Sequence, residues 1–209
     1  MDRPNILVVG SMNMDLYVEG ANWIPKFGES VPCGHYGYAT GGKGSNQAIA
    51  ASKQGANVTM VGRVGADEYG RALQEALRKE GICADYVTAD PDHQTGLALM
   101  LLNEDGRYVS YCAMGGNDYI GEEDVKRALE GGSFDMVVMQ LEMPLETVYR
   151  TYELAREKGI PVFLDAGPAK SIPLERLKGL YILSPNEAET EAMTGIYPDT
   201  EEHARQAAQ

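Results

Sequence analysis

The chain has 209 residues, of which 44% are hydrophobic and 23% charged, a composition that excludes a collagen-like or wholly disordered protein. Its 18 basic and 31 acidic residues give a net charge of −13, so the sequence predicts no nucleic-acid partner. No apolar run approaches the roughly 20 residues that a membrane-spanning helix needs, so we expect no membrane partner. The three widely spaced cysteines, Cys33, Cys83 and Cys112, fit neither a disulfide framework nor a zinc site and indicate the reducing cytoplasm.

Short apolar runs that alternate with helical segments predict an α/β fold. The strand-like runs lie at 5–10, 58–62, 134–140, 160–165 and 180–184. The helical segments lie at 45–54, 68–80 and 145–158, and Gly81 and Gly159 follow the last two as natural helix ends. This alternation predicts a mostly parallel sheet with helices on both faces, within a single domain that spans residues 1–209.

Two segments interrupt the alternation. Residues 13–39 lack a helical period, and 95–102 and 107–113 predict two strands around the turn Asn103-Glu104-Asp105-Gly106. We therefore expect a small second sheet, built from parts of 13–39 and 95–113, that projects from the α/β body. Near the end of the chain, Thr200-Glu201-Glu202 predicts a helix start, but little follows that could cover the flank of the strand at 180–184. This pattern predicts that residues 1–209 are the N-terminal part of a longer fold.

A glycine-rich segment, Gly41-Gly42-Lys43-Gly44-Ser45-Asn46, leads into the first helix. With Gly37 it nearly matches a phosphate-binding P-loop, but Gly44 stands where that loop requires Ser or Thr, and no apolar strand precedes it. Its glycines allow a ligand to approach the backbone closely, and Asn46 suits a neutral hydroxylated ligand. A tight turn without a ligand explains the same residues equally well, so the residues alone leave both interpretations open.

Polar side chains also follow the predicted strands. Asn13 and Asp15 point to one face of an extended segment after the first strand, and Glu142 follows the strand at 134–140. Asn186 and Glu189 follow the strand at 180–184, and their spacing places them on one face of a helix that starts there, within reach of a hydrated Mg²⁺. Asn13 and Asp15 also suit an ordinary turn, and Glu189 alone is better explained as a carboxylate that stabilises a helix start.

Taken together, these segments resemble the ribokinase-like (PfkB-type) sugar kinases along essentially the whole chain. The resemblance implies a three-layer sandwich with a small β-sheet lid, through which a homodimer forms. It also implies ATP and Mg²⁺ as cofactors, with Asn186 beside the ATP phosphates and Glu189 ordering the Mg²⁺. The residues that it implies for sugar binding are Asn13, Met14, Asp15, Gly41, Gly42, Lys43, Gly44, Ser45, Asn46 and Glu142.

The sequence departs from this family in one important respect. The family's Gly-Ala-Gly-Asp segment, whose Asp is the catalytic base, does not occur in residues 1–209. We expect that base, the adenine pocket and a monovalent-cation site to lie beyond Gln209, so the 209-residue chain alone should be inactive. A smaller departure is Asp165-Ala166-Gly167-Pro168, where these kinases often carry Asn-Pro-x-Pro.

The resemblance predicts ATP-dependent phosphorylation of a pentose, with ribose as the first candidate. Two alternatives stay open. The protein could be a non-catalytic sugar-binding or dimerising relative of such kinases. It could also be a kinase for another sugar or a nucleoside, with its specificity set by small-sheet residues near Ala98, Met100 and Cys112.

Overall fold

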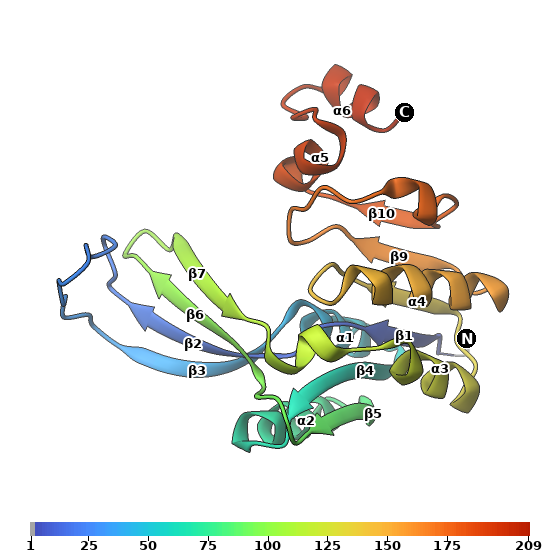
Figure 1. The fold of residues 1–209 in the computed structure, drawn as a ribbon, viewed down its shortest axis with the longest axis horizontal. Coiled ribbons are helices and arrows are strands. Elements are labelled where there is room, and N and C mark those ends of the chain that lie inside the picture. Colours follow the sequence, from blue (N-terminus) through green and yellow to red (C-terminus); the bar gives the residue numbers. More distant parts are fainter. Residues whose placement is uncertain (1–2) are drawn as a thin grey trace.

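The computed structural model describes residues 3–209 and contains two β-sheets (Figure 1). The large sheet has six strands, all parallel, in the order β10-β9-β8-β1-β4-β5. All five apolar runs identified in the sequence contribute strands to it. The strands are β1 (Asn5–Val9), β4 (Asn57–Gly65), β5 (Cys83–Asp90), β8 (Met136–Met139), β9 (Val162–Asp165) and β10 (Ile182–Ser184).

Helices cover both faces of this sheet because β1 and its neighbours are apolar on both sides. Val8 packs into a cluster with α1 and α2, whereas Leu7 and Val9 pack on the opposite face with α3 and α4. Each of these strand side chains is fully buried and contributes about 1.5–3 kcal/mol to stability. The helices are α1 (Lys43–Lys53), α2 (Glu68–Lys79), α3 (Glu122–Gly131), α4 (Leu145–Glu157), α5 (Glu187–Thr194) and α6 (Glu201–Ala207), with 3-10 turns at Gly115–Tyr119 and Leu174–Leu177.

The second sheet, which we call the small sheet, projects away from these layers (Figure 1). Its strand order is β3-β2-β6-β7, with β2 and β6 parallel and the two outer pairs antiparallel. The sequence predicted its last two strands to within one residue at each end. The strands are β2 (Asn13–Glu19), β3 (Tyr36–Gly41), β6 (Gly96–Leu102) and β7 (Tyr108–Ala113).

The two faces of the small sheet differ in chemistry. One row of paired residues carries Asp15 between Ala39 and Ala98, with Cys112 beyond Ala98. The next row, whose side chains point to the other face, is apolar and aromatic: Tyr38, Leu16, Leu99 and Tyr111. The small sheet therefore presents a polar face with Asp15 and an apolar face with tyrosines at both edges.

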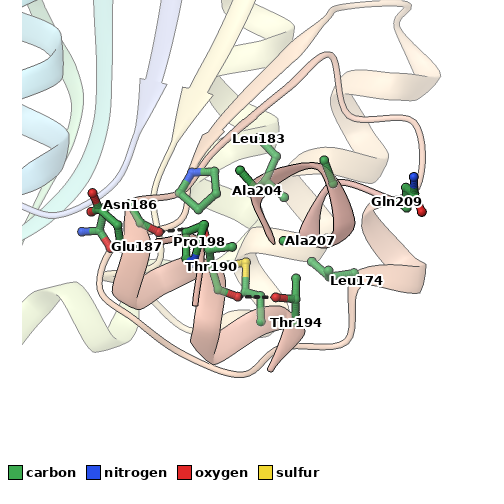
Figure 2. A pocket seen from close by; sticks show the side chains of 13 residues that line it. Leu174, Leu183, Asn186, Glu187, Thr190, Thr194, Pro198, Ala204, Ala207 and Gln209 are labelled. Carbon is green, nitrogen blue, oxygen red and sulfur yellow. Dashed lines mark hydrogen bonds between the residues drawn. The ribbon is translucent and has the colours of Figure 1, made fainter. Parts of the chain in front are cut away.

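The chain ends beside β10, at one edge of the large sheet, where α5 and α6 extend from the layers (Figure 1). Tyr181 is 66% exposed and Ile182 40% exposed, which agrees with the uncovered flank expected for this strand. The Thr200 side chain accepts a hydrogen bond from the His203 amide and caps α6, as predicted. A hollow of about 710 Å³ lies between β10, α5 and α6 and is open to solvent. Figure 2 shows the side chains that line it, among them Asn186 and Glu187.

Among residues 3–209, none of the helices combines the length and apolar character required to cross a bilayer.

Candidate functional site

The strand order of the large sheet reverses at β1. Strands β4 and β5 lie on one side of β1, and β8, β9 and β10 lie on the other. The connecting helices accordingly change from one face of the sheet to the opposite face, so β1 marks the place where the strand order reverses. Open parallel sheets bind ligands in the crevice at such a point. The segment Gly10–Met12 leaves β1 there and continues into β2 with Asn13.

The glycine segment lies directly against the chain that leaves β1. Gly42 has a φ of +97°, and a Cβ atom added to it would lie 2.7 Å from the Asn13 amide nitrogen and 2.8 Å from the Ser11 carbonyl oxygen. A Cβ on Gly44 would lie 2.7 Å from the Gly10 carbonyl carbon. Ser45 fixes the loop, because its hydroxyl donates to the Gly41 and Gly42 carbonyls and its amide donates to Ser11. These contacts require glycine at both positions.

The start of α1 is not a phosphate cradle. The N-cap residue of α1, Gly42, has no side chain that could accept from the first helix amides. These amides nevertheless have acceptors elsewhere in the protein. Gly44 N donates to the Ser11 hydroxyl at 3.4 Å, and Lys43 N lies 3.5 Å from Glu142 Oε2. Because these amides are engaged, the rejection of the P-loop interpretation agrees with the geometry.

Two carboxylates lie close together beside this loop. Glu142 follows β8 and accepts a hydrogen bond of 2.6 Å from the Ser11 hydroxyl. Burial raises the pKa of Asp15, and the negative charge of Glu142 raises it further. The two carboxylates repel each other, and hydroxyl donors from a neutral ligand would relieve this repulsion.

The remaining residues predicted for sugar binding differ in how they face this region. Asn13 is only 5% exposed, whereas Asn46 lies in the first turn of α1 with its side chain exposed. Met14 lies between Asn13 and Asp15 in β2, so its side chain points to the opposite face and is buried. Only the backbone of Met14 can therefore face a ligand beside Asn13 and Asp15.

Asn117 holds this part of the chain in place, and the sequence analysis did not identify it. Its side chain is fully buried and hydrogen-bonds Met12 N at 2.9 Å, Met12 O at 3.1 Å and Asn13 Oδ1 at 2.8 Å. The one signal in the sequence is an Asn after two glycines that follow a strand, which is also typical of an ordinary turn.

A second set of contacts, also not predicted, joins the ends of β8 and β9 to α1. Gln140 Nε2 donates to Gln47 Oε1 at 2.5 Å, and Gln47 Nε2 donates to Asp165 Oδ2 at 2.8 Å. Asp165 Oδ1 accepts from the Gly167 amide at 2.9 Å. Asp165, which departs from the family pattern, thus acts here as an acceptor that holds Gln47.

Asn186 and Glu189 meet at the start of α5, as their spacing predicted. The Glu189 amide donates to Asn186 Oδ1 at 2.9 Å, and Asn186 N donates to Glu189 Oε2 at 2.8 Å. This reciprocal pair is a capping box, so Glu189 has the role of stabilising a helix start that the residue alone favoured. Glu189 Oε1 and Lys43 Nζ each lie 2.9 Å from the Cβ position of Gly167, so the two side chains approach the same point.

A magnesium ion fits this region only in a limited way. No group of three or more His, Cys, Asp or Glu side chains in residues 3–209 could hold a metal ion. Glu189 is a single carboxylate, and Mg²⁺ in phosphate-transfer sites is held by one or two carboxylates together with phosphates and water. Glu189 is therefore compatible with ordering a hydrated Mg²⁺ that the phosphates themselves hold.

Comparison with known proteins decides the family. The model of the pfkB family carbohydrate kinases matches residues 3–209. The chain belongs to this family. It is 32% identical to a ribokinase of Haemophilus influenzae over 207 residues and 34% identical to a deoxyribokinase of Salmonella typhi over 206 residues. These alignments cover 99% and 98% of the chain and 67% of each relative.

The fold agrees with this assignment. The structure of Arabidopsis thaliana ribokinase in complex with ribose and ATP superposes with a TM-score of 0.86 at 33% identity. That alignment covers 99% of this chain and 68% of the Arabidopsis chain. The predicted family and the predicted α/β fold, with a mostly parallel sheet and an additional small sheet, are both confirmed. The chain thus spans about two thirds of the length of these sugar kinases.

Proposed function

We propose that the protein transfers the γ-phosphoryl group of ATP to the 5-hydroxyl of ribose, and that residues 1–209 supply the sugar site and its lid. The observation that supports the sugar site is the proximity of Asp15, Glu142 and the Gly41–Asn46 loop at the carboxyl end of β1. This set presents the carboxylates of Asp15 and Glu142 as acceptors and the side chains of Lys43 and Asn46 as donors within one region. Such a mixture suits a neutral ligand with several hydroxyl groups.

Each residue has a distinct part in this proposal. The carboxylates of Asp15 and Glu142 accept hydrogen bonds from sugar hydroxyls, and Lys43, Asn13 and Asn46 donate to sugar oxygens. Gly41, Gly42 and Gly44 let the sugar approach the backbone, Ser45 keeps the loop in shape, and Met14 contributes its backbone. The small sheet closes over the sugar with its Asp15 face and excludes water from the reaction.

The nucleotide lies in this proposal on the β10 side of the sugar. Asn186 faces the ATP phosphates, and Glu189 orders a hydrated Mg²⁺, which neutralises charge on the phosphates. The Lys43 ammonium and the Glu189 carboxylate both approach Gly167, where sugar and phosphates would meet in this proposal. Positioning and charge neutralisation are the main contributions that a protein makes to phosphoryl transfer.

Residues 1–209 alone are proposed to bind ribose without useful turnover. They contain no Gly-Ala-Gly-Asp segment, which in this family provides the base and the amides that hold the transferring phosphoryl group. Each of these contributions is worth roughly 10²–10⁴ in rate. Ribose-dependent ADP production by the pure 209-residue protein at ordinary kinase rates would contradict this statement.

The binding site itself is tested by calorimetric titration of the 209-residue protein with ribose. Asp15→Ala should weaken ribose binding at least tenfold, because it removes a charged acceptor from the site. Asp105→Ala is the matched control, since Asp105 is a carboxylate in the exposed turn of the same sheet and its loss should leave the affinity unchanged. Absence of ribose binding, or equal affinities of the two variants, would contradict the proposal.

The exact sugar is tested in the same titration. The 34% identity to a deoxyribokinase makes 2-deoxyribose the principal competitor of ribose. Ala98 and Cys112 lie in the same row as Asp15 and would contact the part of the sugar that differs. If the protein binds 2-deoxyribose more tightly than ribose, 2-deoxyribose would become the proposed substrate in place of ribose.

The small sheet and the cysteines support proposals for the oligomeric state and the cellular location of the protein. We propose a homodimer through the apolar face of the small sheet, where Tyr36 is 64% exposed and Tyr111 65% exposed. An exposed apolar face on a short sheet is stabilised when a second copy covers it.

All three cysteines are free thiols, which supports a reducing compartment and hence the cytoplasm. Cell fractionation tests the location.

A further inference from the structure

Asn117 lies where the chain passes repeatedly between the two sheets. Its amide bonds to the backbone of Met12, which leads from β1 into β2, and to the carbonyl oxygen of Met114, which follows β7. It also packs on Gly96, where β6 begins, because a Cβ on Gly96 would lie 2.3 Å from Asn117 Nδ2 and 2.2 Å from Asn13 Oδ1. Three connections of the small sheet therefore meet at one buried side chain.

The backbone groups around Asn117 fix the orientation of its amide. Oδ1 faces the N–H group of Met12, which can only donate, at 2.9 Å. Nδ2 faces the carbonyl oxygens of Met12 and Met114, which can only accept, at 3.1 and 2.9 Å. Reversing this amide would oppose like groups at all three contacts, so Nδ2 must face Asn13, and its two hydrogens are shared among the oxygens of Met12, Met114 and Asn13.

The orientation of Asn117 in turn determines that of Asn13. Because Asn117 offers a donor at 2.8 Å, the Asn13 atom that faces it must be the acceptor Oδ1. Asn13 Nδ2 then points away from Asn117. Within residues 3–209 this nitrogen has no hydrogen-bond partner and is not among the buried unpaired atoms, so it is open to solvent.

We infer that Asn117 is a positioning residue that fixes Asn13 as a hydrogen-bond donor to the sugar. This inference rests on the proposed sugar site. Asn117 does not touch the sugar itself and acts by withholding the acceptor atom of Asn13. The site therefore favours a ligand whose oxygen accepts a hydrogen bond from Asn13 Nδ2. It disfavours a ligand whose hydroxyl has to donate a hydrogen bond at that position.

The first test is a double-mutant cycle on ribose affinity in the 209-residue protein, with thermal unfolding as a check that each variant is folded. Asn117→Asp keeps the shape but replaces the donor by an acceptor, so the amide of Asn13 should turn over and ribose affinity should fall roughly tenfold. In an Asn13→Ala background, Asn117→Asp should change the affinity by less than about twofold. Asn103→Asp adds the same charge in the β6–β7 turn and should have no effect.

The second test needs no variant. In ¹⁵N-labelled unmodified protein, ribose should shift the side-chain amide signal of Asn13 and slow its hydrogen exchange, while the buried amide of Asn117 is already protected. Additive losses in the cycle, or an Asn13 amide signal that ribose leaves unchanged, would overturn the role of Asn117 alone. Failure of the unmodified protein to bind ribose would overturn the proposed function as well.

Discussion

Replacing Gly42 by alanine tests how closely the glycine loop lies on the chain that leaves β1. Gly55, just after α1, offers a matched comparison because its φ of +96° is nearly the same as the +97° of Gly42. A Cβ on Gly55 would have nothing within 4 Å, whereas a Cβ on Gly42 would lie 2.7–2.8 Å from three backbone atoms of Ser11, Met12 and Asn13. The two substitutions therefore share a strongly positive φ and differ in the steric overlap.

The expected losses in the free energy of unfolding follow from these two contributions. A non-glycine residue with positive φ costs about 1–2 kcal/mol, which applies to both variants. Steric overlap in a packed region costs roughly a further 1–3 kcal/mol, which applies to Gly42→Ala alone because backbone atoms cannot rotate away. For a chain of this size about 1 kcal/mol lowers Tm by roughly 2–4 °C, so Gly55→Ala should cost about 2–8 °C and Gly42→Ala about 4–20 °C.

Thermal and urea unfolding of the two variants, each compared with the unmodified protein, measure the difference. Gly42→Ala should also reduce ribose affinity, because the overlap displaces the Asn13 backbone, whereas Gly55→Ala should leave the affinity unchanged. Equal losses of stability in the two variants would refute the close approach. A stable Gly42→Ala variant with unchanged ribose affinity would refute the role of this backbone contact in the site.

Three further predictions concern charge and assembly. Burial acts to raise the pKa of Asp67, but hydrogen bonds from the Thr95 hydroxyl and from backbone amides outweigh it, so its folded pKa lies below the ordinary value of about 3.9. The stabilisation that the Asp67 carboxylate provides is thus complete above about pH 4 and is lost as the pH falls through the folded pKa. Asp67→Asn should therefore reduce the fall in the urea midpoint of unfolding at acid pH. A fall as steep as in the unmodified protein would contradict this. Because burial and the charge of Glu142 raise the pKa of Asp15, ribose affinity should fall on acidification at a higher pH than an ordinary carboxyl would give. Glu142→Gln should move the midpoint of this loss of affinity to lower pH, as measured by ribose titrations across pH 4–7. Light scattering after size-exclusion chromatography should show a dimer that Tyr111→Ser weakens, and a monomer at all concentrations would rule out the proposed interface.

The sequence was sufficient where structure follows from local pattern. β1 is predicted because Asn5–Val9 is a short apolar run that a glycine ends, and β6 and β7 are predicted because a turn with Gly106 separates two β-type segments. β5 was not predicted, since its polar and apolar residues are mixed and its register on β4 shifts partway along. α3 was missed; it begins after Gly121 and ends at Gly131 and Gly132, and glycines are typical of turns.

The candidate site was predictable only in part, for a different reason. Asn13, Asp15 and Glu142 follow strand ends, and the rule that ligands bind at those ends is visible in the sequence. The contacts that hold them are not local, as the bond between Met12 and Asn117 joins residues 105 positions apart. No periodicity or motif records such a pairing, so Asn117 could be found only in three dimensions.

The meeting of the small-sheet connections at Asn117 has a mechanical consequence. The sheet is held at the end next to Asn13, where Tyr38 of β3 also packs on Tyr69 of α2, and its far turn extends away from the layers (Figure 1). Strand β6 has 7 residues, which at roughly 3.3 Å each place the far turn about 23 Å from Asn13. A rotation of about 10° would therefore move that turn by about 4 Å. The same rotation would hardly displace Asn13. If the small sheet is the lid proposed above, such a rotation would open the sugar site for exchange of a ligand while Asn13 stays in position.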